Sequence, residues 1–138
     1  MNKLIKSDLF DSFLIREAVV HTSFKSILDG HRNMDFYNTD EKEGLSPYLT
    51  WGEMRPYIYH IILGNKSPSY FKIILSTNRS KTEAISDQVD TFFVNITFRS
   101  SEITVSTGVA YKTFTLDKSP ESIWDNKIKN FLFKYNFL

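Results

Sequence analysis

The chain has 138 residues, of which 41% are hydrophobic and 15% aromatic, and it contains no cysteine. This composition predicts one folded domain over residues 1–138, and the lack of thiols excludes disulfides, thiolate nucleophiles and thiolate metal sites. With 17 basic and 16 acidic residues, the formal net charge is +1, which argues against nucleic-acid binding. No apolar run approaches the ~20 residues of a membrane span, and "MNKLIKSDLF" lacks a signal-peptide pattern, so we expect a cytoplasmic protein that does not contact a membrane.

The N-terminal third is predicted to contain a short helix followed by two strands. Residues 2–10 place Leu4, Ile5 and Leu9 on one side, as in a short helix. Residues 12–30 are dense in β-branched and aromatic side chains and end at an Asp-Gly turn signal. We expect two strands there, separated near residues 21–23. The polar stretch 38–47 predicts a surface loop.

The stretch "TWGEMRPYIYHIILG" (50–64) predicts a helix. Thr50 and Glu53 have the spacing of a capping box, and Gly64 is placed to end the helix. Pro56 lies inside and removes one backbone hydrogen bond, so we expect a kink or a restart there. At about 100° per residue, one apolar face collects five side chains, namely Trp51, Met54, Ile58, Ile61 and Ile62.

Two interpretations of Glu53 and His60 are open in that helix. A carboxylate and an imidazole in a cleft could perform general acid–base chemistry. However, the helical phase points both residues away from the apolar face, and the capping role already accounts for Glu53. We therefore interpret them as part of a solvated or partner-facing surface.

The C-terminal half predicts strands, a short helix and a meander. A strand is expected at 69–77, followed by a helix that opens with a Ser80–Glu83 capping box and ends near Gln88. Residues 91–100 alternate, with Phe92, Val94, Ile96 and Phe98 on one face. Two more strands are expected, divided by a turn at Thr107-Gly108.

The last element is a long amphipathic helix. Ser119 is the expected N-cap, and Pro120 the first helical residue. An apolar stripe follows at helical spacing, made of Trp124, Ile128, Phe131, Leu132 and Tyr135. The predicted fold is therefore α+β, a single domain with an antiparallel sheet of about six strands and this helix packed across one face.

The sequence carries no recognisable catalytic motif. Neither serine-nucleophile patterns nor glycine-rich phosphate loops are present. Asp29, His31 and Asp35 stand close in sequence and could hold a metal ion, but a turn after a strand attracts the same residue types. We expect no metal site and no cofactor, and a protein that is not an enzyme; a metal-dependent hydrolase ranks third.

Two functions rank above it. The first is a non-enzymatic binding or protein-interaction module that forms a homodimer or docks a protein partner. The high aromatic content supports it, because an uncovered aromatic sheet face marks a partner surface or a ligand groove, here predicted at Tyr70, Phe93 and Tyr111. A different interpretation of these aromatic residues is that the other helices cover this face. The alternative is a pocket for a small apolar molecule between the sheet and the last helix, by analogy with helix-grip proteins, lined by Trp51, Tyr57, Trp124, Ile128 and Tyr135.

Several segments resemble a family of small uncharacterised proteins from Gram-positive bacteria, classed as a domain of unknown function. They are "FDSFLIREA" (10–18), "ILDGH" (27–31), "WGEMRPYIYHIILGNKSPSYFKIIL" (51–75), and the stretch from "VNITF" to "SPESIWD" (94–125). The more distinctive features are Trp51 with Arg55-Pro56, and "FTLDKS" followed by Trp124. The resemblance implies a bacterial cytoplasmic protein, and an additional strand and part of a helix before the position of Met1. It implies no activity and no site residue.

Overall fold

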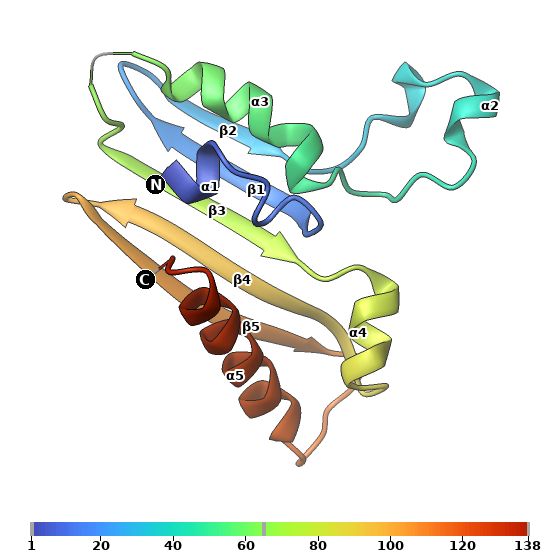
Figure 1. Ribbon diagram of the computed structural model, residues 1–138. Helices are drawn as coiled ribbons and strands as arrows, with labels where there is room; N and C mark the ends of the chain where they lie inside the picture. The colour runs from blue at the N-terminus through green and yellow to red at the C-terminus, as the bar shows by residue number, and fades with distance from the viewer. Residues whose placement is uncertain (1, 65, 138) are drawn as a thin grey trace.

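The computed structural model describes residues 2–64 and 66–137. Five strands and several helices follow one another along the chain (Figure 1). In order they are α1 (Asn2–Ile5), β1 (Leu14–His21), β2 (Lys25–Asp29), the 3-10 helix η1 (Met34–Phe36), α2 (Thr39–Lys42), α3 (Trp51–Ile62), β3 (Tyr70–Ser76), α4 (Arg79–Ile85), β4 (Val89–Arg99), β5 (Glu102–Tyr111) and α5 (Ser119–Lys134).

The strands form one antiparallel sheet in the order β2-β1-β3-β4-β5. Two hairpins, β1–β2 and β4–β5, flank β3, which pairs with β1 on one side and β4 on the other. Helices α1, α3 and α5 lie on the same face of the sheet, and α4 lies at the end where β3 leads into β4 (Figure 1). The predicted α+β class, with a C-terminal helix across one face of an antiparallel sheet, is confirmed.

The sheet has five strands because the expected turn at Thr107-Gly108 is absent. Residues 102–111 form one continuous strand, in which Gly108 pairs with Phe93. A Cβ atom on Gly108 would lie 3.7 Å from the Cβ atom of Phe93, an ordinary packing distance, so nothing around Gly108 requires a turn or a glycine. Thr107 donates a hydrogen bond to Asp125 on α5 over 3.0 Å. The two residues that suggested a turn therefore serve cross-strand and helix contacts.

The helix ends agree with the predictions in part. The capping box of Thr50 is confirmed, and α3 runs without a restart through Pro56. The predicted box at Ser80 is wrong, since Asn78 caps α4 by accepting a hydrogen bond from the Lys81 amide over 2.8 Å. Asparagine is as good an N-cap as serine and comes two residues earlier. Helix α5 likewise has Lys118 rather than Ser119 at its N-cap.

The core lies between the sheet and the helices on its covered face. The alternating side chains of β4 are buried there as predicted. On the expected face of α3, Trp51, Met54 and Ile58 are buried, whereas Ile61 and Ile62 are half-buried at its C-terminal end. The two tryptophans bond to backbone carbonyls, Trp51 to Leu4 over 3.2 Å and Trp124 to Phe93 over 2.8 Å. Both rings thus satisfy their polar atom while filling the core.

Candidate functional site

A β-bulge in β1 turns the side chain of Arg16 onto the sheet face opposite the helices. The pairing of β1 with β3 shifts register between Ile15 and Glu17, so Arg16 is the extra residue. The Gly30 amide donates to the carbonyl of Arg16 over 2.9 Å. A Cβ atom on Gly30 would stand 1.8 Å from the carbonyl oxygen of Ile15, so only glycine fits against the bulge.

The guanidinium of Arg16 is held on several sides. Its Nε donates to Ser76 Oγ over 2.9 Å, and its Nη2 donates to Thr91 Oγ1 over 3.4 Å. Its central carbon lies 3.9 Å from the centre of the Tyr48 ring and 5.6 Å from that of Phe93. These contacts fix the position and plane of the group before any ligand arrives.

One edge of that guanidinium has no protein partner. Within residues 2–64 and 66–137, no carboxylate lies within ion-pair distance of Arg16, and no hydrogen bond involves its Nη1. Every buried polar side-chain atom in the same residues has a hydrogen-bond partner, so the Nη1 of Arg16 is not buried. Arg16 is therefore a cation in a fixed position whose Nη1 can still donate hydrogen bonds to a ligand.

This side chain lines a cleft of about 440 Å³ at the end of the sheet where α4 begins. Arg79 and Lys112 add two positive charges to its walls, and Glu83 and Asp90 two negative ones. Glu83 lies 3.4 Å from Arg79, and Asp90 accepts a hydrogen bond from Thr91. The other lining residues are Leu14, Ser46, Pro47, Tyr48, Thr77, Asn78, Ser80, Thr82, Val89 and Thr91.

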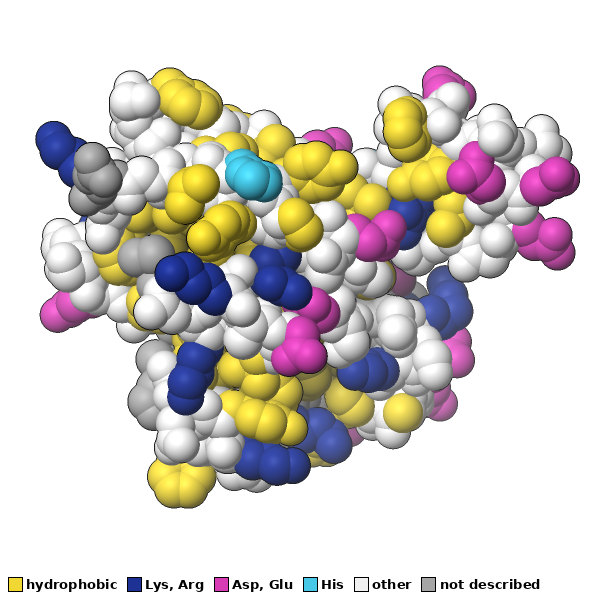
Figure 2. Space-filling view, turned by 45° about the horizontal axis from the view of Figure 1, so that its top comes forward, with side chains coloured by type: hydrophobic (Ala, Val, Ile, Leu, Met, Phe, Trp, Pro, Cys, Tyr) yellow, Lys and Arg dark blue, Asp and Glu magenta, His cyan; other side chains and the backbone are white. Residues whose placement is uncertain are grey.

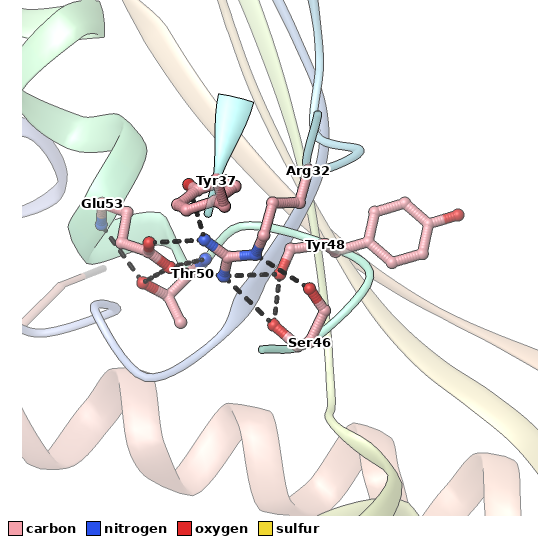
Figure 3. A network of polar contacts seen from close by, with 6 residues as sticks. All are labelled: Arg32, Tyr37, Ser46, Tyr48, Thr50 and Glu53. Carbon is pink, nitrogen blue, oxygen red and sulfur yellow. Dashed lines mark hydrogen bonds and ion pairs between the residues drawn. The ribbon is translucent and has the colours of Figure 1, made fainter. Parts of the chain in front are cut away.

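An ion pair between the buried Arg32 and the half-exposed Glu53 holds the segment that carries Tyr48 (Figure 3). The Arg32 side chain is 3% exposed, and its two terminal nitrogens donate to the carboxylate of Glu53 over 2.8 and 3.0 Å. Its Nε donates to the Ser46 carbonyl over 2.9 Å, and its Nη2 to the Tyr48 carbonyl over 3.4 Å. In Figure 3 the Tyr48 ring points away from the pair, and it stacks on Arg16. The pair thus braces one wall of the cleft.

The same contacts decide the ionisation of both groups. Hydrogen bonds from Arg32 lower the pKa of Glu53 to about 2, helped by the Thr50 amide and opposed by partial burial. Bonds to Glu53 raise the pKa of Arg32 above its ordinary value. The pair is consequently charged across the physiological range.

Glu53 is exposed at the start of α3, in agreement with the surface interpretation, but it also has a partner that the sequence did not predict. Its capping role is present, with the Thr50 amide 3.0 Å from Oε1, but the carboxylate also neutralises the buried Arg32. The loop from 30 to 50 returns to the helix start, which no local pattern reveals. His60 is exposed as well, on the side of α3 away from its apolar face, as expected.

The residues predicted to line an apolar pocket do not converge on one site. Trp51 is fully buried in the core, whereas Tyr57 on the same helix is 69% exposed. Trp124 and Ile128 form part of a second cleft, between α4 and α5. Tyr135 is the C-cap of α5 and is 42% exposed.

The residues predicted for an interaction surface are divided between the two faces. Tyr70 and Phe93 lie on the uncovered face. Tyr70 is paired with Arg99 across β3 and β4, and Phe93 lies beside Arg16. Tyr111 is on the helix side, where its hydroxyl donates to Glu121 over 3.1 Å.

The possible metal ligands form only a pair. His31 Nδ1 lies 2.8 Å from Asp29 Oδ1 at the end of β2, and hydrogen bonds from His31 lower the pKa of Asp29. Asp35 belongs to η1 instead. In the described part of the chain, no three His, Cys, Asp or Glu side chains gather as metal ligands. Among the same residues, no helix is long and apolar enough to cross a membrane.

The sequence interpretation missed Arg16, Tyr48, Arg32 and Lys112. One signal was available for Arg16, because an arginine inside the apolar run "FLIREAVV" must find a polar environment on one sheet face. The others come together only through the path of the chain between β2 and α3 and the end of β5.

These features define a two-layer α+β protein with a polar cleft at one end of its sheet. The chain belongs to a family of unknown function, DUF5721, whose pattern matches residues 3–138. The predicted resemblance to such a family is confirmed in that respect. Comparison with curated proteins and with solved structures gave no match.

Proposed function

We propose that this protein is a non-enzymatic binding protein that holds a small molecule bearing an oxyanion, a carboxylate or a phosphate, in the cleft at Arg16. The observation that carries the proposal is the guanidinium that is fixed by Ser76, Thr91 and Tyr48 while its Nη1 has no partner. An arginine presents its donors in a rigid fork that matches carboxylate and phosphate oxygens.

The surroundings of Arg16 favour ligand binding over a purely structural role. Its protein contacts are hydroxyls and aromatic rings, and no carboxylate of residues 2–64 and 66–137 lies within ion-pair distance of it. Because these contacts already order the side chain, a ligand does not have to bear that entropy cost. The charges of Arg79 and Lys112 are balanced by those of Glu83 and Asp90, so the charge of Arg16 is the excess in the cleft. A volume of about 440 Å³ is within the range of small-molecule sites.

Isothermal titration calorimetry on the whole chain tests the proposal with inorganic phosphate, succinate and benzoate as probes. We expect saturable binding of at least one probe, weakened about tenfold or more in Arg16→Gln, because one charge-assisted contact contributes on that order. Arg99→Gln is the matched control, since Arg99 lies on the same sheet face over the Tyr70 ring but outside the cleft. The proposal is wrong if no probe binds, or if both variants bind equally well.

A second candidate is self-association through the uncovered sheet face. None of the described helices covers this face (Figure 1), and it carries Tyr70 and Phe93 together with Ile27, which is 72% exposed. Native mass spectrometry of the protein from its own host measures oligomeric mass and retained ligand together. A dimer that dissociates when Ile27 is replaced by Glu would support this candidate, and a monomer carrying an added anionic mass would reject it in favour of the first.

A further inference from the structure

A second cleft lies on the other side of α4, between that helix and α5. It has a volume of about 410 Å³ and is lined by Ser12, Phe13, Thr77, Lys81, Ala84, Ile85, Trp124, Lys127, Ile128 and Phe131. Figure 2 shows hydrophobic surface in the lower half of the molecule, where α5 lies, with Lys and Arg side chains around it. This α4–α5 cleft shares only Thr77 with the cleft at Arg16.

The walls of the α4–α5 cleft are apolar and its charges have one sign. Three elements bring aromatic and aliphatic side chains to it: the segment before β1, α4 and α5. The only charged lining residues in the described chain are Lys81 and Lys127. Neither has a carboxylate within ion-pair distance among the described residues. Lys81 Nζ instead lies 3.5 Å from Ser12 Oγ and 5.8 Å from the centre of the Phe13 ring.

We propose that the α4–α5 cleft binds a small apolar molecule with a single carboxylate, such as a medium-chain fatty acid. Trp124 and Ile128 are only 5% and 4% exposed and add little surface. The apolar body would therefore contact mainly Phe131, Ile85 and Ala84, and the carboxylate would meet the two lysines. Burial of apolar area supplies most of the affinity of such a ligand, and the lysines select its charge. The proposal does not depend on the function proposed for the Arg16 cleft, which requires no apolar body.

The dimensions favour a small molecule over a docked helix. Helix α4 has seven residues, so the wall that it forms is about 10 Å long. A partner helix that contributes three or four turns would extend well past it. The volume of about 410 Å³ is in the range of small-ligand sites. On the opposite wall, α5 contributes Trp124 and Ile128, two of the residues expected from the sequence to bind an apolar ligand. The cleft nevertheless lies between α5 and α4, and not between α5 and the sheet.

Calorimetry with decanoate and uncharged decanol, below their aggregation concentrations, tests the proposal on the whole chain. We expect one-to-one binding of decanoate, accompanied by a change in tryptophan emission because Trp124 lines the cleft and Trp51 is fully buried elsewhere. The double variant Lys81→Gln/Lys127→Gln should bind decanoate about tenfold more weakly and decanol unchanged. Lys129→Gln is the control, since Lys129 lies on the same helix but pairs with Asp125 at 2.9 Å.

A variant that fills the space keeps the test independent of charge. Ala84 is exposed on α4 and lines the cleft, so Ala84→Trp obstructs it without entering the core. We expect this variant to keep its unfolding temperature and to lose decanoate binding. The proposal is overturned by any of three results: no saturable binding of decanoate, equal binding of decanoate and decanol to the native chain, or unchanged binding in Ala84→Trp.

Discussion

The substitution Glu53→Gln isolates the charge that neutralises Arg32. Glutamine has nearly the same shape and can still accept the hydrogen bond from the Thr50 amide, so the capping box is kept. What is lost is the negative charge beside a guanidinium whose side chain is 3% exposed. An uncompensated buried charge is among the few changes that destabilise a protein strongly.

The magnitude follows from the burial of the two partners. Removal of one member of a fully buried pair costs about 3–5 kcal/mol. The Glu53 side chain is 43% exposed, so water already screens part of the interaction, and we expect about 2–3 kcal/mol. For 138 residues the unfolding entropy near the midpoint is about 0.29 kcal/mol/K, so Tm should fall by about 7–10 °C.

Urea denaturation followed by tryptophan emission measures the free energy of unfolding directly. Glu83→Gln is the control, because Glu83 makes an exposed pair with Arg79 and its loss should change stability by no more than about 0.5 kcal/mol. If Glu53→Gln proves no more destabilising than Glu83→Gln, the pair with Arg32 does not stabilise this fold in the way described.

Three other outcomes are expected. The difference in stability between the native chain and Glu53→Gln should be fully present above pH 4.5, the ordinary pKa of a glutamate. It should be lost as the pH falls through the folded pKa of about 2, because the carboxylate is then protonated. A difference that does not depend on pH in urea titrations would contradict this. Gly30→Ala should cost about 3 kcal/mol or more, since its Cβ would stand 1.8 Å from a carbonyl oxygen, whereas Gly64→Ala, with open space around it, should stay within about 0.5 kcal/mol by thermal unfolding. Trp124→Phe should lose about 0.5–1.5 kcal/mol, because the hydrogen bond from the indole to the Phe93 carbonyl is lost, and unchanged urea unfolding would refute that role.

Local patterns were sufficient for the elements whose neighbours in sequence decide their structure. The alternation of β4 and the apolar stripe of α5 each place large side chains on one side of a regular element, so burial of that side follows from periodicity. The capping box of Thr50 is equally local, because its donors and acceptors are three residues apart. Two residues that can cap a helix, Asn78 and Ser80, stand two positions apart, and the prediction of Ser80 as the cap of α4 was wrong.

Neither cleft could be derived in the same way. Arg16 meets Thr91, which is 75 residues away, and Arg32 meets Glu53 only after the chain has crossed η1 and α2. The bulge that turns Arg16 to the uncovered face depends on the register of β1 against β3. A sequence pattern specifies faces and ends of elements, whereas these contacts depend on which strands become neighbours. The prediction of a turn at Thr107-Gly108 was wrong for a related reason, since Gly108 is paired with Phe93 on the neighbouring strand.

The order of strands also has a kinetic meaning. The hairpins β1–β2 and β4–β5 join residues close in sequence, whereas the pairing of β1 with β3 closes a loop from His21 to Tyr70 that contains β2 and α3. Strand pairing over such a long sequence separation is slower to form than a local hairpin, because the entropy of closing the loop is lost before the contacts stabilise it. Arg16 lies in β1, whereas Thr91 lies in β4 and Lys112 follows β5. The Arg16 cleft therefore contains residues from both sides of the β1–β3 pairing. Separation of the two halves during unfolding must break that cleft, and a molecule bound across it would slow the unfolding rate more than the folding rate.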